Sequence, residues 1–220
     1  MKKTKKDYEY ILFDLDGTIT DPMIGITNSV MHALKKFDIE VTDRSELYPF
    51  IGPPLAYSFQ TFCGLTEEQS QAAIGYYREY YAPKGIFECN LYDGMADVFA
   101  ELKARGKKVV MATSKPEEFA IKLLKHYNLF KYFDCVAGAT MDERIGTKIE
   151  VMQMAIDRMG ITDMSKAIMI GDRNYDIDGA KHFGMDSIGV TYGYGGKEEL
   201  EHAGADYIVD EPMEILEYTL

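Results

Sequence analysis

The chain has 220 residues, 46% of them hydrophobic, so it can bury one substantial core and still carry a smaller accessory domain. Its 24 basic and 36 acidic residues give a formal net charge of −12 at pH 7, which argues against nucleic acid and anionic membranes as partners. The three cysteines are too widely spaced to suggest a disulfide framework or a zinc site.

Neither the start of the chain nor any later stretch predicts an exported or membrane-bound protein. The apolar run that follows the lysine-rich start is too short for a signal peptide. No stretch approaches the roughly 20 apolar residues that a membrane helix needs. We therefore expect a cytoplasmic protein that is a monomer or a weak homodimer.

The first predicted element is a buried strand over residues 10–13, a short and continuously apolar run. It leads directly into the segment DLDGT at residues 14–18. The strand therefore delivers two aspartates, Asp14 and Asp16, to its carboxyl end.

The next region, residues 22–91, shows helical apolar spacing throughout and no strand signal. Pro53 precedes one helix of this region, and Thr66 with Gln69 forms a capping-box start for a tyrosine-rich helix that runs to Tyr81. We interpret residues 22–91 as an all-helical domain inserted into a core made of residues 1–21 and 92–220.

The second half of the chain alternates between strands and helices. Further strands are predicted at residues 108–112, 167–170, 187–190 and 207–209. One intervening helix ends at Gly160, and its predicted apolar face consists of Ile149, Met152, Ile156 and Met159. Such alternation implies a parallel sheet, so the predicted fold class is α/β, with a Rossmann-like parallel sheet and an inserted helical domain.

The candidate functional residues come directly after strands, at the edge of a parallel sheet where ligands bind. In chain order they are Asp14 and Asp16, Thr113 and Ser114, and Asp172 and Asp176. The four carboxylates are expected to gather, and like charges this close require a cation or a shared proton. An all-oxygen site with room for water and phosphate suits magnesium, so we expect these four acids to bind Mg2+.

The same residues fit the hydrolysis of a phosphate ester. Asp14, ionised at neutral pH, can attack phosphorus. Asp16 can protonate the leaving alcohol and then activate water, if its neighbours raise its pKa. Thr113 and a helix start near Pro116 can donate hydrogen bonds to the phosphoryl oxygens, and Lys148 supplies positive charge.

These motifs resemble the haloacid dehalogenase superfamily over nearly the whole chain. The resemblance rests on residues 14–18, Thr113, a later lysine and the Gly-Asp-x-x-x-Asp run that ends at Asp176. It implies Asp14 as nucleophile, Asp16 as an acid/base whose main-chain carbonyl also binds magnesium, and a helical cap for the insertion. The residues expected to contact the phosphate are Leu15, Gly17, Thr113, Ser114 and Lys148.

The chain is most similar to the phosphoglycolate-phosphatase branch and to bacterial members described as 5′-nucleotidase or tyrosine-phosphate phosphatase. We therefore expect a Mg2+-dependent phosphatase that acts on a small-molecule phosphate ester through an aspartyl-phosphate. Two alternatives are a phosphomutase of the same superfamily and a non-catalytic phosphate-binding regulatory protein. The sequence leaves open whether the substrate is phosphoglycolate, a nucleotide, a sugar phosphate or tyrosine phosphate.

Several assignments have an alternative. Lys115 competes with Lys148 as the phosphate-binding lysine, and Arg173 either reaches the substrate or pairs with an acid. The segment from Phe50 to Pro54 is expected to face the active site because its Gly-Pro-Pro run makes a rigid loop. The tyrosines at 76, 77, 80 and 81 are interpreted as packing residues rather than a binding wall, and the glycines around Tyr194 as a turn.

Overall fold

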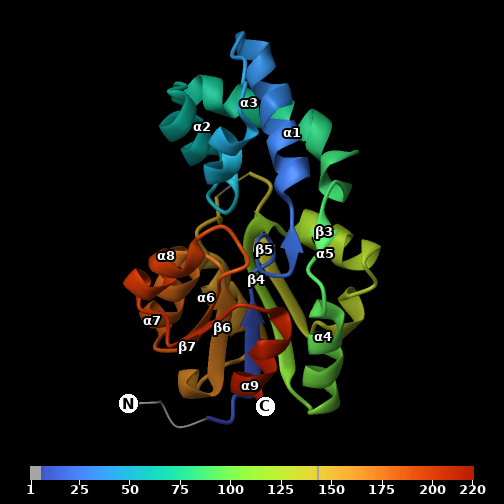
Figure 1. The fold of residues 1–220 in the computed structure, drawn as a ribbon, viewed down its shortest axis with the longest axis vertical. Coiled ribbons are helices and arrows are strands. Elements are labelled where there is room, and N and C mark those ends of the chain that lie inside the picture. Colours follow the sequence, from blue (N-terminus) through green and yellow to red (C-terminus); the bar gives the residue numbers. More distant parts are fainter. Residues whose placement is uncertain (1–5, 143) are drawn as a thin grey trace.

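A parallel sheet of six strands forms the centre of the computed structural model, which describes residues 6–142 and 144–220 (Figure 1). The strands are β1 (Tyr10–Phe13), β4 (Lys108–Pro116), β5 (Cys135–Ala139), β6 (Ala167–Gly171), β7 (Asp186–Val190) and β8 (Tyr207–Val209). They lie in the order β5-β4-β1-β6-β7-β8, and all neighbours are parallel. The predicted α/β class with a parallel sheet is confirmed.

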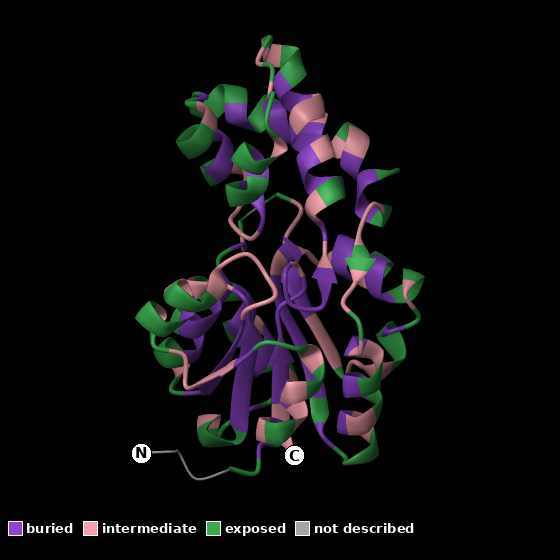
Figure 2. Cartoon of the chain, in the orientation of Figure 1, coloured by how far each residue is buried: buried purple, intermediate pink, exposed green. Residues whose placement is uncertain are grey.

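Helices cover both faces of this sheet. They are α4 (Met95–Ala104), α5 (Glu117–His126), α6 (Lys148–Met159), α7 (Asn174–Phe183), α8 (Gly196–Ala203) and α9 (Ile215–Thr219). Ile11 and Phe13 of β1 join one core with α4, α5 and α9, whereas Leu12 joins a second core with α6 and α7, because successive strand residues point to opposite faces. β6 and β7 are buried along their whole length, whereas the edge strands β5 and β8 are partly buried (Figure 2).

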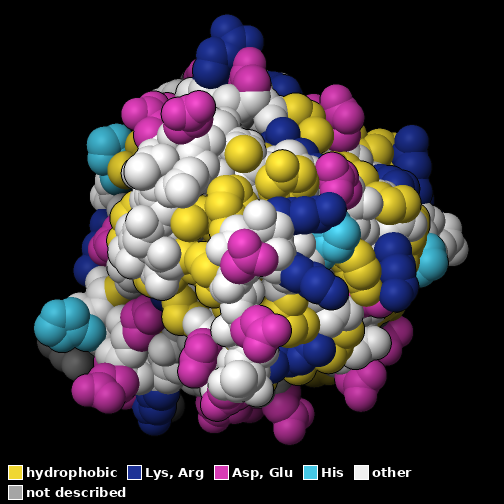
Figure 3. Space-filling view, turned by 90° about the horizontal axis from the view of Figure 1, so that it is seen from above, with side chains coloured by type: hydrophobic (Ala, Val, Ile, Leu, Met, Phe, Trp, Pro, Cys, Tyr) yellow, Lys and Arg dark blue, Asp and Glu magenta, His cyan; other side chains and the backbone are white. Residues whose placement is uncertain are grey.

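Three further helices, α1 (Met23–Leu34), α2 (Leu55–Cys63) and α3 (Glu67–Tyr81), stand beyond the carboxyl ends of the strands (Figure 1). The predicted capping box is present, with Thr66 and Gln69 each accepting a hydrogen bond from the main-chain N–H of the other. Seen from this end, acidic and basic side chains are interspersed with hydrophobic ones (Figure 3). No helix within the described residues is long and apolar enough to span a membrane.

The chain passes between the sheet and the helical segment twice, and the two connecting stretches pair with each other. β2 (Thr20–Asp21) and β3 (Asn90–Leu91) form a short antiparallel ribbon. Asp21 also accepts a hydrogen bond from Met23 N at 3.0 Å and so supports the start of α1. The region predicted to lack strands therefore contains one at its end, too short to carry a periodic signal.

Two other features differ from the prediction. The prediction misses β5, an edge strand of small residues whose first half is only partly buried. The predicted apolar face of α6 is right for Met152 and Ile156, which are buried, and for Met159, which packs against the second core, but it is wrong for Ile149, which is 40% exposed. Lys148 is buried in its place. A charged residue at the start of this helix points inward because it has a partner in the site.

Candidate active site

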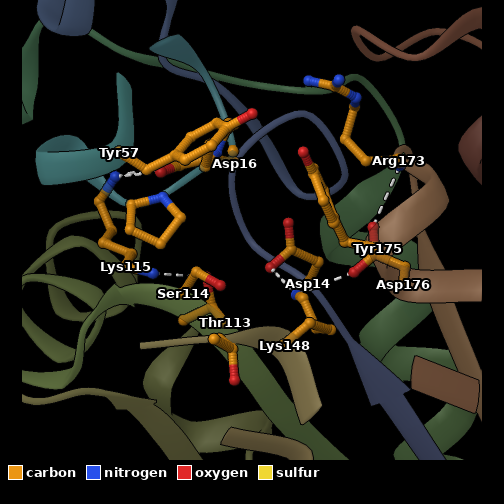
Figure 4. Close-up of a pocket in the computed structure, with 14 residues that line it drawn as sticks. Asp14, Asp16, Tyr57, Thr113, Ser114, Lys115, Lys148, Arg173, Tyr175 and Asp176 are labelled. Atoms are coloured by element: carbon orange, nitrogen blue, oxygen red, sulfur yellow. Dashed lines mark hydrogen bonds and ion pairs between the residues drawn. The ribbon is translucent and has the colours of Figure 1, made fainter. Parts of the chain in front are cut away.

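The carboxyl ends of β1, β4 and β6 meet around a cavity of about 420 Å3 (Figure 4). β1 pairs with β4 on one side and with β6 on the other, so residues far apart in the sequence come together here. The strand order reverses here, because β4 and β5 lie on one side of β1 and β6 to β8 on the other, and parallel α/β sheets bind ligands at such a switch point. The predicted site residues that line the cavity are Asp14, Asp16, Thr113, Ser114, Lys148 and Asp176.

Three buried acids form a cluster at the base of the cavity. Asp14, Asp172 and Asp176 each place a carboxylate oxygen within 4.8 Å of the others. Lys148 Nζ lies 2.6 Å from Asp14 Oδ1 and 2.8 Å from Asp176 Oδ1. Three carboxylates and one ammonium leave a formal charge of −2, the charge that a divalent cation would neutralise.

Asp172 directly follows β6 and is held by hydrogen bonds from two sides. Its carboxylate accepts hydrogen bonds from Tyr194 N at 2.8 Å and from Thr18 Oγ1 at 3.3 Å. Two glycines leave room for it, since a Cβ on Gly17 would lie 2.2 Å from Asp172 Oδ2 and one on Gly193 would lie 2.3 Å from Asp172 Cβ. Burial, followed by the charges of Asp176 and Asp14, raises the pKa of Asp172.

Asp176 reaches the cluster as a capping residue of α7. Its Oδ2 accepts a hydrogen bond from Arg173 N at 3.1 Å, which turns the side chain back toward the helix start. Burial raises the pKa of Asp176 to about 6, although Lys148 opposes the shift. Despite its ion pair with Lys148, Asp176 Oδ1 has no hydrogen bond of good geometry within the described residues. It is therefore an acceptor with capacity left for a metal.

Lys148 enters the site from the first turn of α6. A capping box between Thr147 and Glu150 begins this helix, which directs Lys148 toward β1 and β4. Its Nζ donates to Asp14 Oδ1 and, at 2.9 Å, to the carbonyl of Ala112. Burial lowers the pKa of the ammonium, but the charges of Asp14 and Asp176 outweigh burial, so the pKa is raised and Lys148 stays protonated.

The side chain of Asp16 does not join the acid cluster, so the expected gathering of four carboxylates is wrong for this residue. Its oxygens lie 2.5 and 2.7 Å from Lys115 Nζ. β1 ends at Phe13, and the chain then turns through Gly17, so the alternation of an extended strand no longer places Asp14 and Asp16 on one side. Burial raises the pKa of Asp16, and Lys115 offsets part of that shift.

The residues expected to contact a phosphate divide into two groups. Thr113 is buried and Ser114 is half-buried on the cavity wall, where the β4 register shifts between Thr113 and Pro116. Leu15 and Gly17 do not line the described cavity. The Leu15 side chain is in the core, and the Gly17 N–H already donates to Thr20 O at 2.7 Å, so Gly17 makes room for Asp172 instead.

The helical segment closes the other side of the cavity. Gly52, Pro53 and Pro54 line it, which confirms that the Gly-Pro-Pro loop faces the site. Arg173 lies at the same rim, paired with Glu199 at 2.9 Å and donating to Ile51 O at 3.1 Å. The pairing of Arg173 with an acid is thereby confirmed.

The sequence analysis misses two aromatic residues of the cavity. Tyr57 of α2 is 51% exposed and Tyr175 of α7 is 41% exposed, although both line the cavity. In Figure 4 their hydroxyl ends point toward the space above Asp14. Neither residue has a sequence signal, because only folding brings α2 and α7 to opposite sides of one site.

The turn predicted around Tyr194 is confirmed, but it also supports the site. While Tyr194 N donates to Asp172, its hydroxyl donates to Asp21 Oδ1, and its ring lies 6.3 Å from that of Tyr48. The flanking glycines are the signal that could have revealed this role, because glycine pairs often mark a close approach of the main chain.

Comparison with known proteins places these residues in one family. Residues 11–190 match the family model described as haloacid dehalogenase-like hydrolase. A 5′-nucleotidase of Pseudomonas aeruginosa is 37% identical over 211 residues, which cover 96% of this chain and 95% of that protein. Tyrosine-protein kinase PtkA of Mycobacterium tuberculosis is 34% identical over 187 residues, or 85% of this chain and 63% of that protein.

Solved structures agree with the sequence comparison. A predicted phosphatase from Clostridium acetobutylicum superposes with a TM-score of 0.92 at 47% identity, covering 96% of this chain and all of the other. The matched region contains the buried acids and Lys148. The chain therefore belongs to the haloacid dehalogenase-like hydrolase family and is one of its phosphatases.

Proposed function

We propose that the chain is a Mg2+-dependent phosphatase that hydrolyses small phosphate monoesters through an aspartyl-phosphate on Asp14. The observation that carries this proposal is the position of Asp14. It lies at the base of an open cavity, touches the ammonium of Lys148 and shares its site with Asp172 and Asp176. A nucleophile, a cation and a metal site are thus within reach of one phosphate.

The donors present fit a magnesium ion. All three clustered side chains are carboxylates, their formal charge with Lys148 is −2, and Asp176 Oδ1 retains unused acceptor capacity. We propose that Asp14, Asp172 and Asp176 hold the ion, with the main-chain carbonyl of Asp16 as a further ligand. A bound ion would offset the repulsion between the phosphate oxygens and the carboxylates.

The chemistry divides between two aspartates. An oxygen of Asp14 forms a bond to phosphorus while the ester P–O bond breaks, and the carboxyl proton of Asp16 passes to the leaving oxygen to give an alcohol. In the second step Asp16 takes a proton from water, the water oxygen bonds to phosphorus, and the bond to Asp14 breaks. Inorganic phosphate leaves and both side chains return to their first state.

The remaining side chains orient the phosphate. We propose that Lys148 and the hydroxyl groups of Thr113 and Ser114 bind its oxygens, because all three residues line the cavity beside Asp14. Residues 22–91 would act as a cap domain that excludes water and selects the substrate, since the Gly-Pro-Pro loop and Tyr57 complete the cavity wall.

The substrate class follows from the two exposed tyrosines. Large aromatic side chains that stay exposed beside a cavity favour a ligand with a flat ring, which can stack between them. Among the substrates considered, a nucleoside 5′-monophosphate or an aryl phosphate fits Tyr57 and Tyr175 better than phosphoglycolate does. The name of the Pseudomonas aeruginosa relative, 5′-nucleotidase, agrees with this choice.

The test is phosphate release from a panel of esters, including nucleoside 5′-monophosphates, phosphotyrosine, sugar phosphates and phosphoglycolate. We expect Mg2+-dependent release that chelator removes and that Asp14→Asn lowers by about 10³-fold or more. Asp178→Asn is the matched control, because Asp178 lies on the same helix as Asp176 but is exposed.

Three results would contradict parts of this proposal. Full activity of Asp14→Asn would exclude the aspartyl-phosphate. Full activity in chelator would exclude the metal. Isomerisation of a sugar phosphate without phosphate release would instead identify a phosphomutase.

A further inference from the structure

A buried ammonium in the cavity wall has no part in the phosphate chemistry described above. The side chain of Lys115 is 4% exposed, and its Nζ lies 2.5 and 2.7 Å from the two oxygens of Asp16. A buried charge is costly unless it is paired and hydrogen-bonded. Contacts with both oxygens also fix the orientation of the carboxyl group, which a single contact would leave free to rotate.

This pair lies apart from the nucleophile. In Figure 4, Asp16 and Lys115 occupy one side of the cavity, whereas Asp14, Lys148 and Asp176 lie together on the other. Both members of the pair line the cavity. A phosphate bound at Asp14 would therefore direct its leaving oxygen across the cavity, toward Asp16.

Side chains of helix α3 complete the surroundings of the Lys115 ammonium. The ammonium lies 5.2 Å from the centre of the Tyr81 ring, a cation–π distance. Tyr77 stacks on Tyr81, with ring centres 5.1 Å apart and an angle of 22° between the planes, and both rings are buried. The helical segment thus holds the Lys115 ammonium through the Tyr81 ring, while Asp16 holds it through an ion pair.

We propose that Lys115 is a positioning residue: its ammonium holds the carboxyl group of Asp16 on the leaving-group side of the cavity. The Tyr81 ring in turn holds the ammonium in place. The proposal rests on the proposed function, because it gives Lys115 an effect only through the proton that Asp16 transfers. Lys148, not Lys115, is then the lysine that serves the phosphate.

Two esters that differ in their need for a proton test this role. The phenolate of p-nitrophenyl phosphate leaves without protonation, whereas an alkyl phosphate needs a general acid. We expect Lys115→Met to lower kcat for the alkyl ester about ten-fold more than for p-nitrophenyl phosphate. KM should stay unchanged for both esters.

Four variants complete the design. Asp16→Asn should show the same leaving-group dependence, and Lys115→Met should cause no further loss for the alkyl ester in an Asp16→Asn background. Lys115→Arg should restore part of the alkyl activity. Lys122→Met is the matched control, because Lys122 is an exposed lysine on α5 that donates to Ala82 O and lies over the ring of the exposed Phe87, away from Asp16.

If Lys115→Met does not fold, a substitution in α3 that removes another contact of the Lys115 ammonium tests the same role. Tyr81→Leu removes the ring over the ammonium and should reproduce the selective loss in smaller degree, whereas Tyr81→Phe keeps the ring and should not. Equal fractional losses for Tyr81→Leu on both esters would overturn the proposal.

The remaining outcomes separate this inference from the proposed function. Equal losses on both esters in Lys115→Met, combined with a leaving-group-dependent loss in Asp16→Asn, overturn the role of Lys115 and leave the phosphatase mechanism standing. A rise in KM for both esters would make Lys115 a phosphate-binding residue and also overturn the proposal. A leaving-group-independent loss in Asp16→Asn overturns both the acid role of Asp16 and the inference.

Discussion

Gly193 shows how closely the main chain approaches the acid cluster. A Cβ at this position would lie 2.3 Å from Asp172 Cβ and 2.5 Å from Gly17 O, distances at which atoms have to move apart. The next residue, Tyr194, donates its main-chain N–H to Asp172. The loop is therefore in contact with a proposed metal ligand through two successive residues, and its position decides where that ligand lies.

Replacing this glycine should weaken metal binding. We expect Gly193→Ala to reduce Mg2+ affinity about 10-fold or more, because it displaces Asp172, and to lower the free energy of unfolding by about 1–3 kcal/mol. Titration calorimetry and urea unfolding measure the two effects. Gly75→Ala is the control: Gly75 lies in α3 with no atom within 4 Å of an added Cβ, so alanine should stabilise slightly and leave Mg2+ binding unchanged. Unaltered affinity in Gly193→Ala would contradict the proposed ligand.

At this scale the sequence predicts which residues meet better than how each one points. Asp14, Asp172 and Asp176 are predictable because they follow strands that a parallel sheet brings together. The partner of Asp16 is not, since its direction depends on a turn at Gly17 after the strand has ended. Tyr57 and Tyr175 carry no signal at all, because their shared cavity exists only after α2 and α7 have packed.

The edge strand β5 shows what fixes an element that has little apolar content. Asp134 precedes it, donates its N–H to Val109 O at 2.8 Å and accepts hydrogen bonds from Val109 N at 2.9 Å and Lys103 Nζ at 2.6 Å. Burial raises the pKa of Asp134, but these hydrogen bonds and the charges of Lys103 and Lys108 outweigh burial and hold it below its ordinary value. This side chain thus adds to the main-chain ladder that joins β5 to β4.

Removing the charge of Asp134 should destabilise the fold in a pH-dependent way. We expect Asp134→Asn to lower the free energy of unfolding by about 1–2 kcal/mol at pH 7. Because the folded-state pKa is depressed, the wild-type carboxylate stabilises the fold at pH values above its ordinary pKa of 3.8, and this contribution is lost as pH falls through the lower folded-state value. Urea unfolding at several pH values should show the unfolding free energies of the two proteins becoming more similar as the pH falls toward 3. A difference in free energy that does not change with pH would contradict the assignment.

Elements are predictable where burial leaves an apolar pattern in the sequence and unpredictable where it does not. β1, β4, β6 and β7 are found because buried parallel strands are largely apolar, and the partly buried edge strand β8 is found because its three residues are also apolar. β5 consists mostly of small residues and is only partly buried, and β2 and β3 are each only two residues long. For α6 the apolar pattern identifies Met152 and Ile156 correctly but also includes the exposed Ile149, because apolar spacing carries no sign of the ion pairs that bury Lys148 instead.

For the molecule as a whole, the acid cluster opposes stability while it prepares a site. Three buried carboxylates share one ammonium, and burial raises the pKa of both Asp172 and Asp176. Each of these groups therefore costs free energy when it is charged in the metal-free fold. A cation that binds only the folded chain would recover that cost.

This conflict predicts opposite effects of one substitution. We expect Asp172→Asn to raise the unfolding temperature of the metal-free protein, since it removes a buried like charge. The same change should abolish the stabilisation that we expect from Mg2+ in the wild type, which amounts to about 2.7 kcal/mol of unfolding free energy at a 100-fold excess over Kd. Thermal unfolding with and without Mg2+ measures both, and Asp178→Asn should behave as wild type. A variant that is less stable without metal and still stabilised by Mg2+ would refute the charge argument.

The position of β1 in the sheet has a consequence for how the chain is made. Among the six strands of the sheet β1 comes first in the chain, yet Phe13 lies opposite Met111 on one side and opposite Ile170 on the other. Until Ile170 has been synthesised, one edge of β1 has no neighbour, and contacts at such separations form slowly. The same late segment, residues 167–176, supplies the second neighbour of β1 and two of the three acids, so β1 becomes enclosed in the sheet and Asp14 gains its acidic neighbours at the same stage of synthesis.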